Sequence, residues 1–276
     1  MTILTKAGND DRLEDDKLMI CLDVDGTIVN HQGLMSARVR EVARAVVKAG
    51  HEVVISTGRS LGAAVPLMTE LGIDHGYVVA SNGGVLARMR GDDVEILHRE
   101  VFDPSLALAA LMRQLPNAKY AVENERGEFL SSDVFTDASF GAESKVVEFD
   151  ELLRSKAVRV VVFSTDATAE DFGQAVHGLG LSGVTYSVGW TAWLDIAAEG
   201  ITKASGLERL RTELEIESAQ TLAVGDGRND IEMLQWAGRG VAMGQAPEEV
   251  KIVADEVTAS VDEDGLAIVL EGLLQD

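Results

Sequence analysis

The chain has 276 residues, of which 46% are hydrophobic and 25% are charged, and this composition excludes a protein that is disordered over most of its length. Its formal net charge of −22 repels nucleic-acid backbones and anionic membrane surfaces, so general binding to either is not expected. The single cysteine, Cys21, excludes an internal disulfide, and we see neither a signal peptide nor a run of about 18 apolar residues, so we expect a cytoplasmic protein.

The first part of the chain predicts alternating strands and helices. Residues 1–16 are polar and acidic and predict a loose N-terminal extension. Short apolar runs, typical of strands that are buried on both faces, then alternate with helical stretches. We expect strands over 18–22, 53–55 and 77–80, and helices over 36–49 and 61–71. This alternation predicts an α/β fold with a doubly wound, Rossmann-like parallel sheet.

The middle of the chain, from about Val85 to Glu199, changes character, because its strands are longer and more often interrupted by polar residues. Expected strands include 94–101, 119–122, 158–164 and 184–188, with helices near 104–115 and 167–179. After Gly200 the first pattern resumes. We expect one helix over 203–214, one that ends at 236, one that begins at 247 and one that begins near 265. Strands are expected over 221–224 and 241–243. The sequence thus predicts a core over 17–85 and 199–276, and an inserted α+β domain over 86–198.

Polar clusters follow four of the predicted core strands. In an open parallel sheet, ligands bind beyond the carboxyl ends of the strands, so these clusters should meet in one crevice. The clusters are Asp23 with Asp25, Thr57 with Gly58, Asn82 with Gly83, and Asp226 with Asn229 and Asp230. Each cluster alone can also be explained as a turn, a helix cap or a helix N-terminus. Their convergence is what indicates a functional site.

The carboxylates indicate a metal ion and acid–base chemistry. Asp23 and Asp25 flank Val24, so in an extended segment their side chains point the same way. Together with Asp226 they repel one another unless a cation binds between them. Mg²⁺ suits such an oxygen-rich site when phosphate oxygens complete its shell. A carboxylate pair also allows one member to attack while its neighbour transfers protons.

In combination, these motifs resemble those of the haloacid dehalogenase-like hydrolase superfamily. DVDGT at 23–27, STGR at 56–59, Lys203 and GDGRND at 225–230 are similar to its four motifs. VAMG at 241–244, followed by AD at 254–255, VT at 257–258 and DG at 264–265, looks like the tail of the Cof-type phosphatase branch. The insert that follows Asn82 and Gly83 resembles the large α/β cap of that branch.

The resemblance implies a role for each motif residue. Asp23 would be the nucleophile that takes the phosphoryl group as an aspartyl-phosphate. Asp25 would protonate the leaving oxygen and then activate water. Thr57, with the Gly58 backbone, would hold the transferring phosphoryl group, and Lys203 would offset the charge on Asp23 and the phosphate.

The resemblance also implies further contacts to the phosphate and to a metal. The phosphate or the substrate would be bound by Arg59, Asn82, Gly83 and Asn229. Mg²⁺ would be bound by Asp23, the carbonyl oxygen of Asp25, Asp226 and Asp230, the last of these directly or through water.

These roles imply a Mg²⁺-dependent phosphatase acting on a small phosphorylated metabolite, for which a sugar phosphate is the commonest choice in this branch. A phosphomutase is the alternative, because the same core can return a phosphoryl group to a second hydroxyl. An inactive phosphate-binding regulatory protein would usually lack the nucleophile or a metal ligand, and this chain lacks neither. The expected partner is a phosphate ester, with no nucleic acid and no membrane, and the sequence leaves the oligomeric state open.

Overall fold

The computed structural model describes residues 17–134, 137–164, 168–189 and 192–274, and the extension expected over 1–16 lies outside them. Its larger sheet has eight strands in the order β14-β13-β12-β1-β2-β3-β4-β5. These strands are β1 (Met19–Leu22), β2 (Glu52–Ser56), β3 (His75–Ala80), β4 (Val85–Arg90), β5 (Asp93–Arg99), β12 (Thr221–Gly225), β13 (Arg239–Ala242) and β14 (Glu256–Val257). In this order, each strand from β14 to β3 runs parallel to the next one. At the other edge, β4 pairs antiparallel with β3, and β5 pairs antiparallel with β4.

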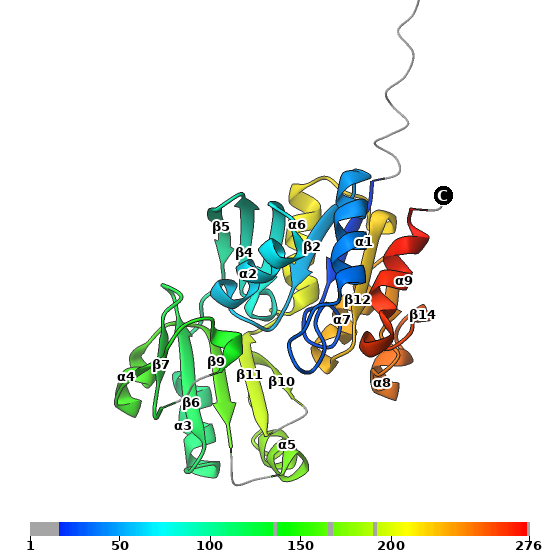
Figure 1. Cartoon of the computed structure of the whole chain (residues 1–276). Coiled ribbons are helices and arrows are strands. Elements are labelled where there is room, and N and C mark those ends of the chain that lie inside the picture. Colours follow the sequence, from blue (N-terminus) through cyan, green and yellow to red (C-terminus); the bar gives the residue numbers. More distant parts are fainter. Residues whose placement is uncertain (1–16, 135–136, 165–167, 190–191, 275–276) are drawn as a thin grey trace, which may run out of the picture.

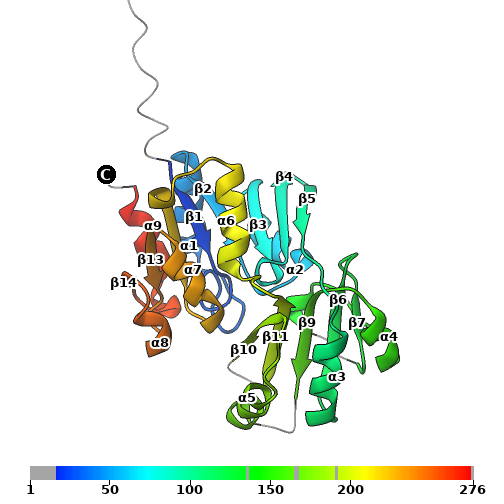
Figure 2. The same ribbon diagram turned by 180° about the vertical axis from the view of Figure 1, so that it is seen from behind.

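Helices cover both faces of this sheet (Figures 1 and 2). One face packs against α1 (Ala37–Lys48), α2 (Leu61–Leu71) and α9 (Gly265–Gly272). The other packs against α6 (Lys203–Glu213), α7 (Ile231–Trp236) and α8 (Glu248–Lys251). The central strand β1 is apolar on both faces, which explains the two helical layers: Ile20 and Leu22 face the first layer, while Met19 and Cys21 face the second. The predicted doubly wound core is therefore confirmed.

The smaller sheet has six strands in the order β10-β11-β9-β6-β7-β8. They are β6 (Lys119–Asn124), β7 (Phe129–Ser131), β8 (Lys145–Val146), β9 (Ala157–Phe163), β10 (Val184–Val188) and β11 (Trp193–Ala198). One face packs against α3 (Ser105–Gln114), α4 (Phe149–Arg154) and α5 (Ala169–Gly178). The two sheets and their helices form two layered bodies that meet below the core strands in Figure 1.

The boundary between the two sheets differs from the expected one. Residues 86–99, which the sequence assigns to the insert, lie in β4 and β5 of the larger sheet. Their alternating polar residues suit an antiparallel edge, where β4 pairs directly with β3 across the short turn at 81–84. The chain then crosses to the smaller sheet, where Phe102 forms a bridge with Ala157. It returns to the core after Ala198, close to the expected position.

Local signals fix several helix ends. The Ser36 side chain accepts a hydrogen bond from the backbone N–H of Val39 and caps α1. Gly72 ends α2 in a left-handed conformation, with φ of 74°. Among the described residues, no helix combines the length and apolar character needed to cross a membrane.

Candidate active site

A buried lysine joins two aspartates beyond the carboxyl ends of the central strands. Lys203 is the first residue of α6, and its Nζ lies 2.6 Å from Asp23 Oδ1 and 2.6 Å from Asp230 Oδ1. Its side chain has no exposed surface. Burial alone would lower the pKa of Lys203, but the two carboxylates outweigh burial and raise it. Lys203 is therefore a fixed positive charge inside the site.

Asp23 directly follows β1, with only 8% of its side chain exposed. Burial, and then the nearby charge of Asp230, raise the pKa of Asp23 well above its ordinary value, and Lys203 acts in the opposite direction. In the described part of the chain, Oδ1 of Asp23 accepts the Lys203 hydrogen bond and Oδ2 accepts none. The second oxygen is therefore available to a ligand.

Asp226 follows the neighbouring strand β12 and is held by a residue that the sequence analysis missed. Gln245 Nε2 donates to Asp226 Oδ2 at 3.1 Å and to the carbonyl oxygen of Gly26 at 2.6 Å. Gln245 in turn accepts the backbone N–H of Val261 at 2.9 Å. Its position just beyond β13, at the same edge of the sheet, is the signal that could have identified it.

Three carboxylates of the site lie close enough to share a divalent cation. One oxygen from each of Asp23, Asp226 and Asp230 lies within 4.8 Å of the others, and all three residues are buried. Lys203 supplies one positive charge against them. Burial, and then the nearby charge of Asp230, raise the pKa of Asp226 to about 6. A hard cation such as Mg²⁺ fits this all-oxygen donor set.

The oxygens of Asp230 are already engaged by the protein itself. Oδ2 accepts the backbone N–H groups of Asp226 and Gly227 at 3.0 and 2.8 Å, while Oδ1 accepts Lys203. Asp230 thus shapes the loop that carries Asp226. Because Asp230 is fully buried and both of its oxygens are held, it is suited to fix this loop beside a bound ion.

Asp25 lies apart from this carboxylate cluster. The backbone N–H of Asp23 still pairs with the carbonyl of Val224 at the end of β12, and a turn begins at Val24, whose carbonyl accepts the N–H of Ile28. The Asp25 side chain is 60% exposed, and Arg59 forms a two-pronged ion pair with it, with Nε at 2.8 Å from Oδ2.

The loops after β2 and β3 meet beside Asp23. Thr57 Oγ1 accepts the backbone N–H of Arg59 at 3.1 Å. Asn229 Nδ2 donates to Asn82 Oδ1 at 2.9 Å, and a Cβ on Gly58 would lie 3.2 Å from that same oxygen. The structure thus brings Gly58, Asn82 and Asn229 together, as expected for residues that surround one ligand.

Gly83, in contrast, packs against the protein. A Cβ at this position would collide with the carbonyl oxygen of Thr202, directly before Lys203. Its φ of 98° also favours glycine. Gly83 lets the turn approach the start of α6, and a direct ligand contact is not needed to explain it.

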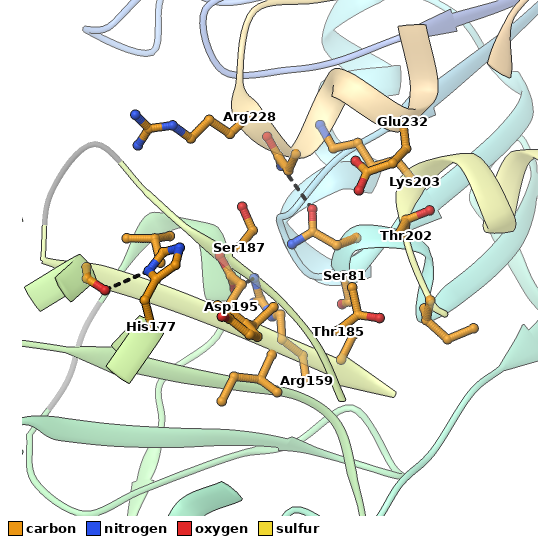
Figure 3. Close-up of a pocket in the computed structure, with 18 of the residues that line it drawn as sticks. Ser81, Arg159, His177, Thr185, Ser187, Asp195, Thr202, Lys203, Arg228 and Glu232 are labelled. Carbon is orange, nitrogen blue, oxygen red and sulfur yellow. Dashed lines mark hydrogen bonds and ion pairs between the residues drawn. The ribbon is translucent and has the colours of Figure 1, made fainter. Parts of the chain in front are cut away.

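A cavity of about 600 Å³ adjoins these residues. Figure 3 shows its two sides: Lys203, Thr202, Ser81, Arg228 and Glu232 come from the core, whereas His177, Thr185, Ser187, Asp195 and Arg159 come from the inserted part. The labelled lining carries hydroxyl, carboxylate, imidazole and cationic groups, while aliphatic residues such as Val188, Ile196 and Ile201 also line the cavity, whose exposed surface is mostly apolar. The cavity can therefore offer both polar and apolar contacts to a ligand that reaches the Lys203 end.

Comparison with known proteins identifies the class to which the chain belongs. The model of haloacid dehalogenase-like hydrolases matches residues 20–270, so the chain belongs to this family, in its Cof-type branch. The family, the α/β fold and the enzyme class predicted from the sequence, a haloacid dehalogenase-like phosphatase, are confirmed.

Individual relatives span nearly the whole chain. Phosphatase YwpJ of Bacillus subtilis is 27% identical to this chain, and the match covers 93% of this chain and 99% of that protein. The 5-amino-6-(5-phospho-D-ribitylamino)uracil phosphatase YcsE of the same organism is 27% identical and covers 90% and 92%. The solved structure of a subclass IIB sugar phosphatase of this superfamily is 25% identical, with a TM-score of 0.77, and covers 93% and 100%.

Proposed function

We propose that this protein is a Mg²⁺-dependent phosphatase that hydrolyses a small, hydroxyl-rich phosphate monoester through an aspartyl-phosphate on Asp23. The observation that carries the proposal is the arrangement around Asp23. Lys203 holds one carboxylate oxygen and leaves the other facing no protein donor in the described part of the chain. This arrangement orients a nucleophile and places a fixed cation beside the phosphate that it attacks.

In the first step, an Asp23 oxygen forms a bond to phosphorus while the bond from phosphorus to the ester oxygen breaks. Asp25 donates a proton to that leaving oxygen, which departs as an alcohol. Lys203 and the Thr57 hydroxyl stabilise the charge on the transferring phosphoryl group. The Asp25 side chain is 60% exposed, and its ion pair with Arg59 holds it at the edge of the site.

In the second step, Asp25 takes a proton from water as the water oxygen attacks phosphorus. The bond between phosphorus and Asp23 breaks, and inorganic phosphate is released with the Asp23 carboxylate restored. Splitting one displacement into two lets Asp25 serve both directions of proton transfer, while Asp23 forms and then loses the bond to phosphorus.

Asp23 and Asp226 would hold Mg²⁺, with the carbonyl oxygen of Asp25 as a further ligand and Asp230 fixing the Asp226 loop. When bound, Mg²⁺ would offset the negative charge of the carboxylates and of the phosphate oxygens. Gln245 orients Asp226 for this role by holding its second oxygen.

The hydroxyl and carboxylate groups that line part of the cavity, together with the relatives, support a sugar or polyol phosphate as substrate. Thr185, Ser187 and Asp195 offer hydroxyl and carboxylate groups on the side opposite Lys203 (Figure 3). The names of two relatives state a sugar phosphatase and a phosphatase of a phosphoribityl compound. A cytoplasmic location stays a prediction. Cys21 is a buried free thiol, which is compatible with a reducing compartment.

The direct test is a phosphate-release assay over sugar phosphates, polyol phosphates, nucleotides, phosphoglycolate and pyridoxal phosphate, with Mg²⁺ and with excess chelator. We expect the highest kcat/KM among sugar or polyol phosphates, loss of activity on chelation, and recovery when Mg²⁺ is restored. Equal rates with and without chelator would contradict the metal-dependent mechanism, and no release from any ester would contradict the proposed function.

Substitution of Asp226 tests the metal site. Asp226→Asn keeps the shape but removes one ligand charge, so the Kd for Mg²⁺ measured by titration calorimetry should rise at least ~10-fold. The pKa of Asp226, raised to about 6, adds a pH dependence to the wild-type protein. The carboxylate is neutral below this pH, so Mg²⁺ affinity should weaken as the pH falls through about 6. An unchanged Kd in Asp226→Asn would remove Asp226 from the metal site.

Gly26 offers a second test of the same site. A Cβ on Gly26 would collide with the Asp226 carboxylate, and its φ of 89° is also unfavourable for alanine. We expect Gly26→Ala to weaken Mg²⁺ binding at least ~10-fold and to destabilise the fold by about 1–3 kcal/mol. Gly33→Ala is the matched control, because Gly33 has φ of 75° but no atom within 4 Å of the added Cβ. Equal effects of the two changes on Mg²⁺ affinity would show that backbone strain alone is responsible.

A further inference from the structure

The inserted domain carries a buried arginine at its junction with the core. Arg159, on β9, has 1% of its surface exposed and lies directly opposite Glu123 of β6 in the sheet register. Opposed residues of antiparallel strands share one face of the sheet. Arg159 Nε lies 3.4 Å from Glu123 Oε2, and Nη1 lies 3.4 Å from Asp195 Oδ1. Two carboxylates therefore offset this guanidinium, which leaves no excess positive charge for an anionic ligand.

The guanidinium reaches across the junction to the loop that contains STGR. Nη1 of Arg159 donates a hydrogen bond to the carbonyl oxygen of Gly58. The rings of Phe129 and Phe140 lie 5.7 and 5.8 Å from the guanidinium carbon. They fill the space around the arginine and favour its cation. The position of Arg159 is thus fixed from the side of the inserted domain.

One peptide group connects this contact to the candidate phosphate site. The carbonyl of Gly58 and the N–H of Arg59 belong to the same planar unit and point in opposite directions. Arg159 binds the carbonyl end, and the N–H end donates to Thr57 Oγ1 at 3.1 Å. Since Thr57 Oγ1 accepts this bond, its own hydroxyl proton remains for another acceptor.

Other contacts from the inserted domain hold the same loop and its neighbour. The N–H of Ser60 donates to the carbonyl of Ser139 at 2.8 Å, and Ser60 Oγ donates to the carbonyl of Phe140 at 2.5 Å. On the adjoining turn, Ser81 Oγ donates to Glu123 Oε2 at 2.7 Å. Glu123 therefore bridges Arg159 and the core, and the loop is held at several points.

We propose that Arg159 is a positioning residue: through the Gly58–Arg59 peptide it orients the Thr57 hydroxyl toward the transferring phosphoryl group. The inserted domain then completes the phosphate-binding loop, in addition to lining the cavity. This inference rests on the proposed function, because it needs the Thr57 loop to hold the phosphoryl group.

Two substitutions of Arg159 test the inference, with activity measured on p-nitrophenyl phosphate and on the best sugar phosphate. Arg159→Lys keeps the charge but loses the planar fork, and Arg159→Met removes both. A small misplacement of a catalytic group costs up to ~100-fold, so we expect kcat to fall about 10-fold in Arg159→Lys and 10- to 100-fold in Arg159→Met on both substrates. Arg154→Met is the control, because Arg154 is 76% exposed on α4 and should leave kcat within twofold.

A double-mutant cycle with Thr57→Ala separates positioning from a general structural role. If Arg159 acts through the Thr57 hydroxyl, Arg159→Lys should lower kcat about 10-fold in the wild-type background and less than twofold in the Thr57→Ala background. Equal losses in the two backgrounds, or a change confined to the KM for the sugar phosphate, would overturn the inference.

Folding and the proposed function are checked separately. Circular dichroism reports the folded fraction, and the charge-retaining Arg159→Lys variant carries the test if Arg159→Met does not fold. A second design, Arg159→Met with Glu123→Gln, removes one charge of each sign and so leaves the net charge of the junction unchanged, with Asp195 still present. A wild-type protein that hydrolyses no phosphate ester would contradict the proposed function. An active wild type with unchanged kcat in folded Arg159 variants would contradict only the role of Arg159.

Discussion

Asp23→Asn is expected to lower kcat at least ~10³-fold, which corresponds to about 4 kcal/mol of activation free energy. Asparagine has almost the same shape, but its amide lacks the charge and nucleophilicity that attack on phosphorus requires. The change also removes a partner of Lys203, which retains Asp230 at 2.6 Å. Steady-state phosphate release by the purified variant measures the effect, and its circular dichroism spectrum should match that of the wild type.

The matched control for this prediction is Asp74→Asn. Asp74 has 85% of its side chain exposed and, within the described residues, forms an ion pair with the neighbouring His75. Its kcat should stay within twofold of the wild-type value. Near-normal turnover by Asp23→Asn would show that another residue carries the covalent step. Trapping of a phosphorylated Asp23 in the wild type would identify the intermediate directly.

Lys203→Met is expected to reduce both activity and stability. Methionine fills a similar volume, but it leaves Asp23 and Asp230 buried without their common cation. Breaking a buried ion pair from one side costs about 3–5 kcal/mol, which denaturant titration should detect as a lower free energy of unfolding. Loss of the charge beside the phosphate should also lower kcat by ~10²- to 10³-fold.

A surface lysine provides the reference for this change. Lys48 is exposed at the end of α1, so Lys48→Met should alter the free energy of unfolding by less than about 0.5 kcal/mol and leave kcat unchanged. Added Mg²⁺ should restore part of the stability of Lys203→Met, because a divalent cation would offset the same carboxylates. A Lys203→Met protein with wild-type stability and activity would show that these carboxylates do not need the ammonium.

The core could be predicted from the sequence because its strands are buried on both faces. Such strands appear as continuous apolar runs, and β1, β2 and β12 lie within a residue or two of their expected bounds. The edge strands β4 and β5 carry alternating polar residues, which the same pattern assigns equally well to a separate domain. Only the pairing of β4 with β3, and of β5 with β4, places them in the core.

Asp23 and Asp226 could likewise be expected at one edge of the sheet, because each directly follows a core strand, whereas Lys203 was expected there only from the resemblance to the family motifs. The ion pair of Asp25 with Arg59 could not be expected, because it forms only when the loops after β1 and β2 pack together. Gln245 and Arg159 have no local motif. Their contacts, to Asp226 and to Gly58, arise only when distant segments pack together.

The turn between β3 and β4 has a consequence for efforts to make this protein more heat-resistant. Ser81 and Asn82 both hold left-handed conformations, with φ of 51° and 53°, which cost a non-glycine residue about 1 kcal/mol or more each. Glycine at either position would relieve that strain. The same replacement would delete the Ser81 contact with Glu123 or the Asn82 contact with Asn229. Relief of backbone strain and loss of these contacts therefore act in opposite directions on the free energy of unfolding, so glycine at this turn is not a route to a more heat-resistant protein.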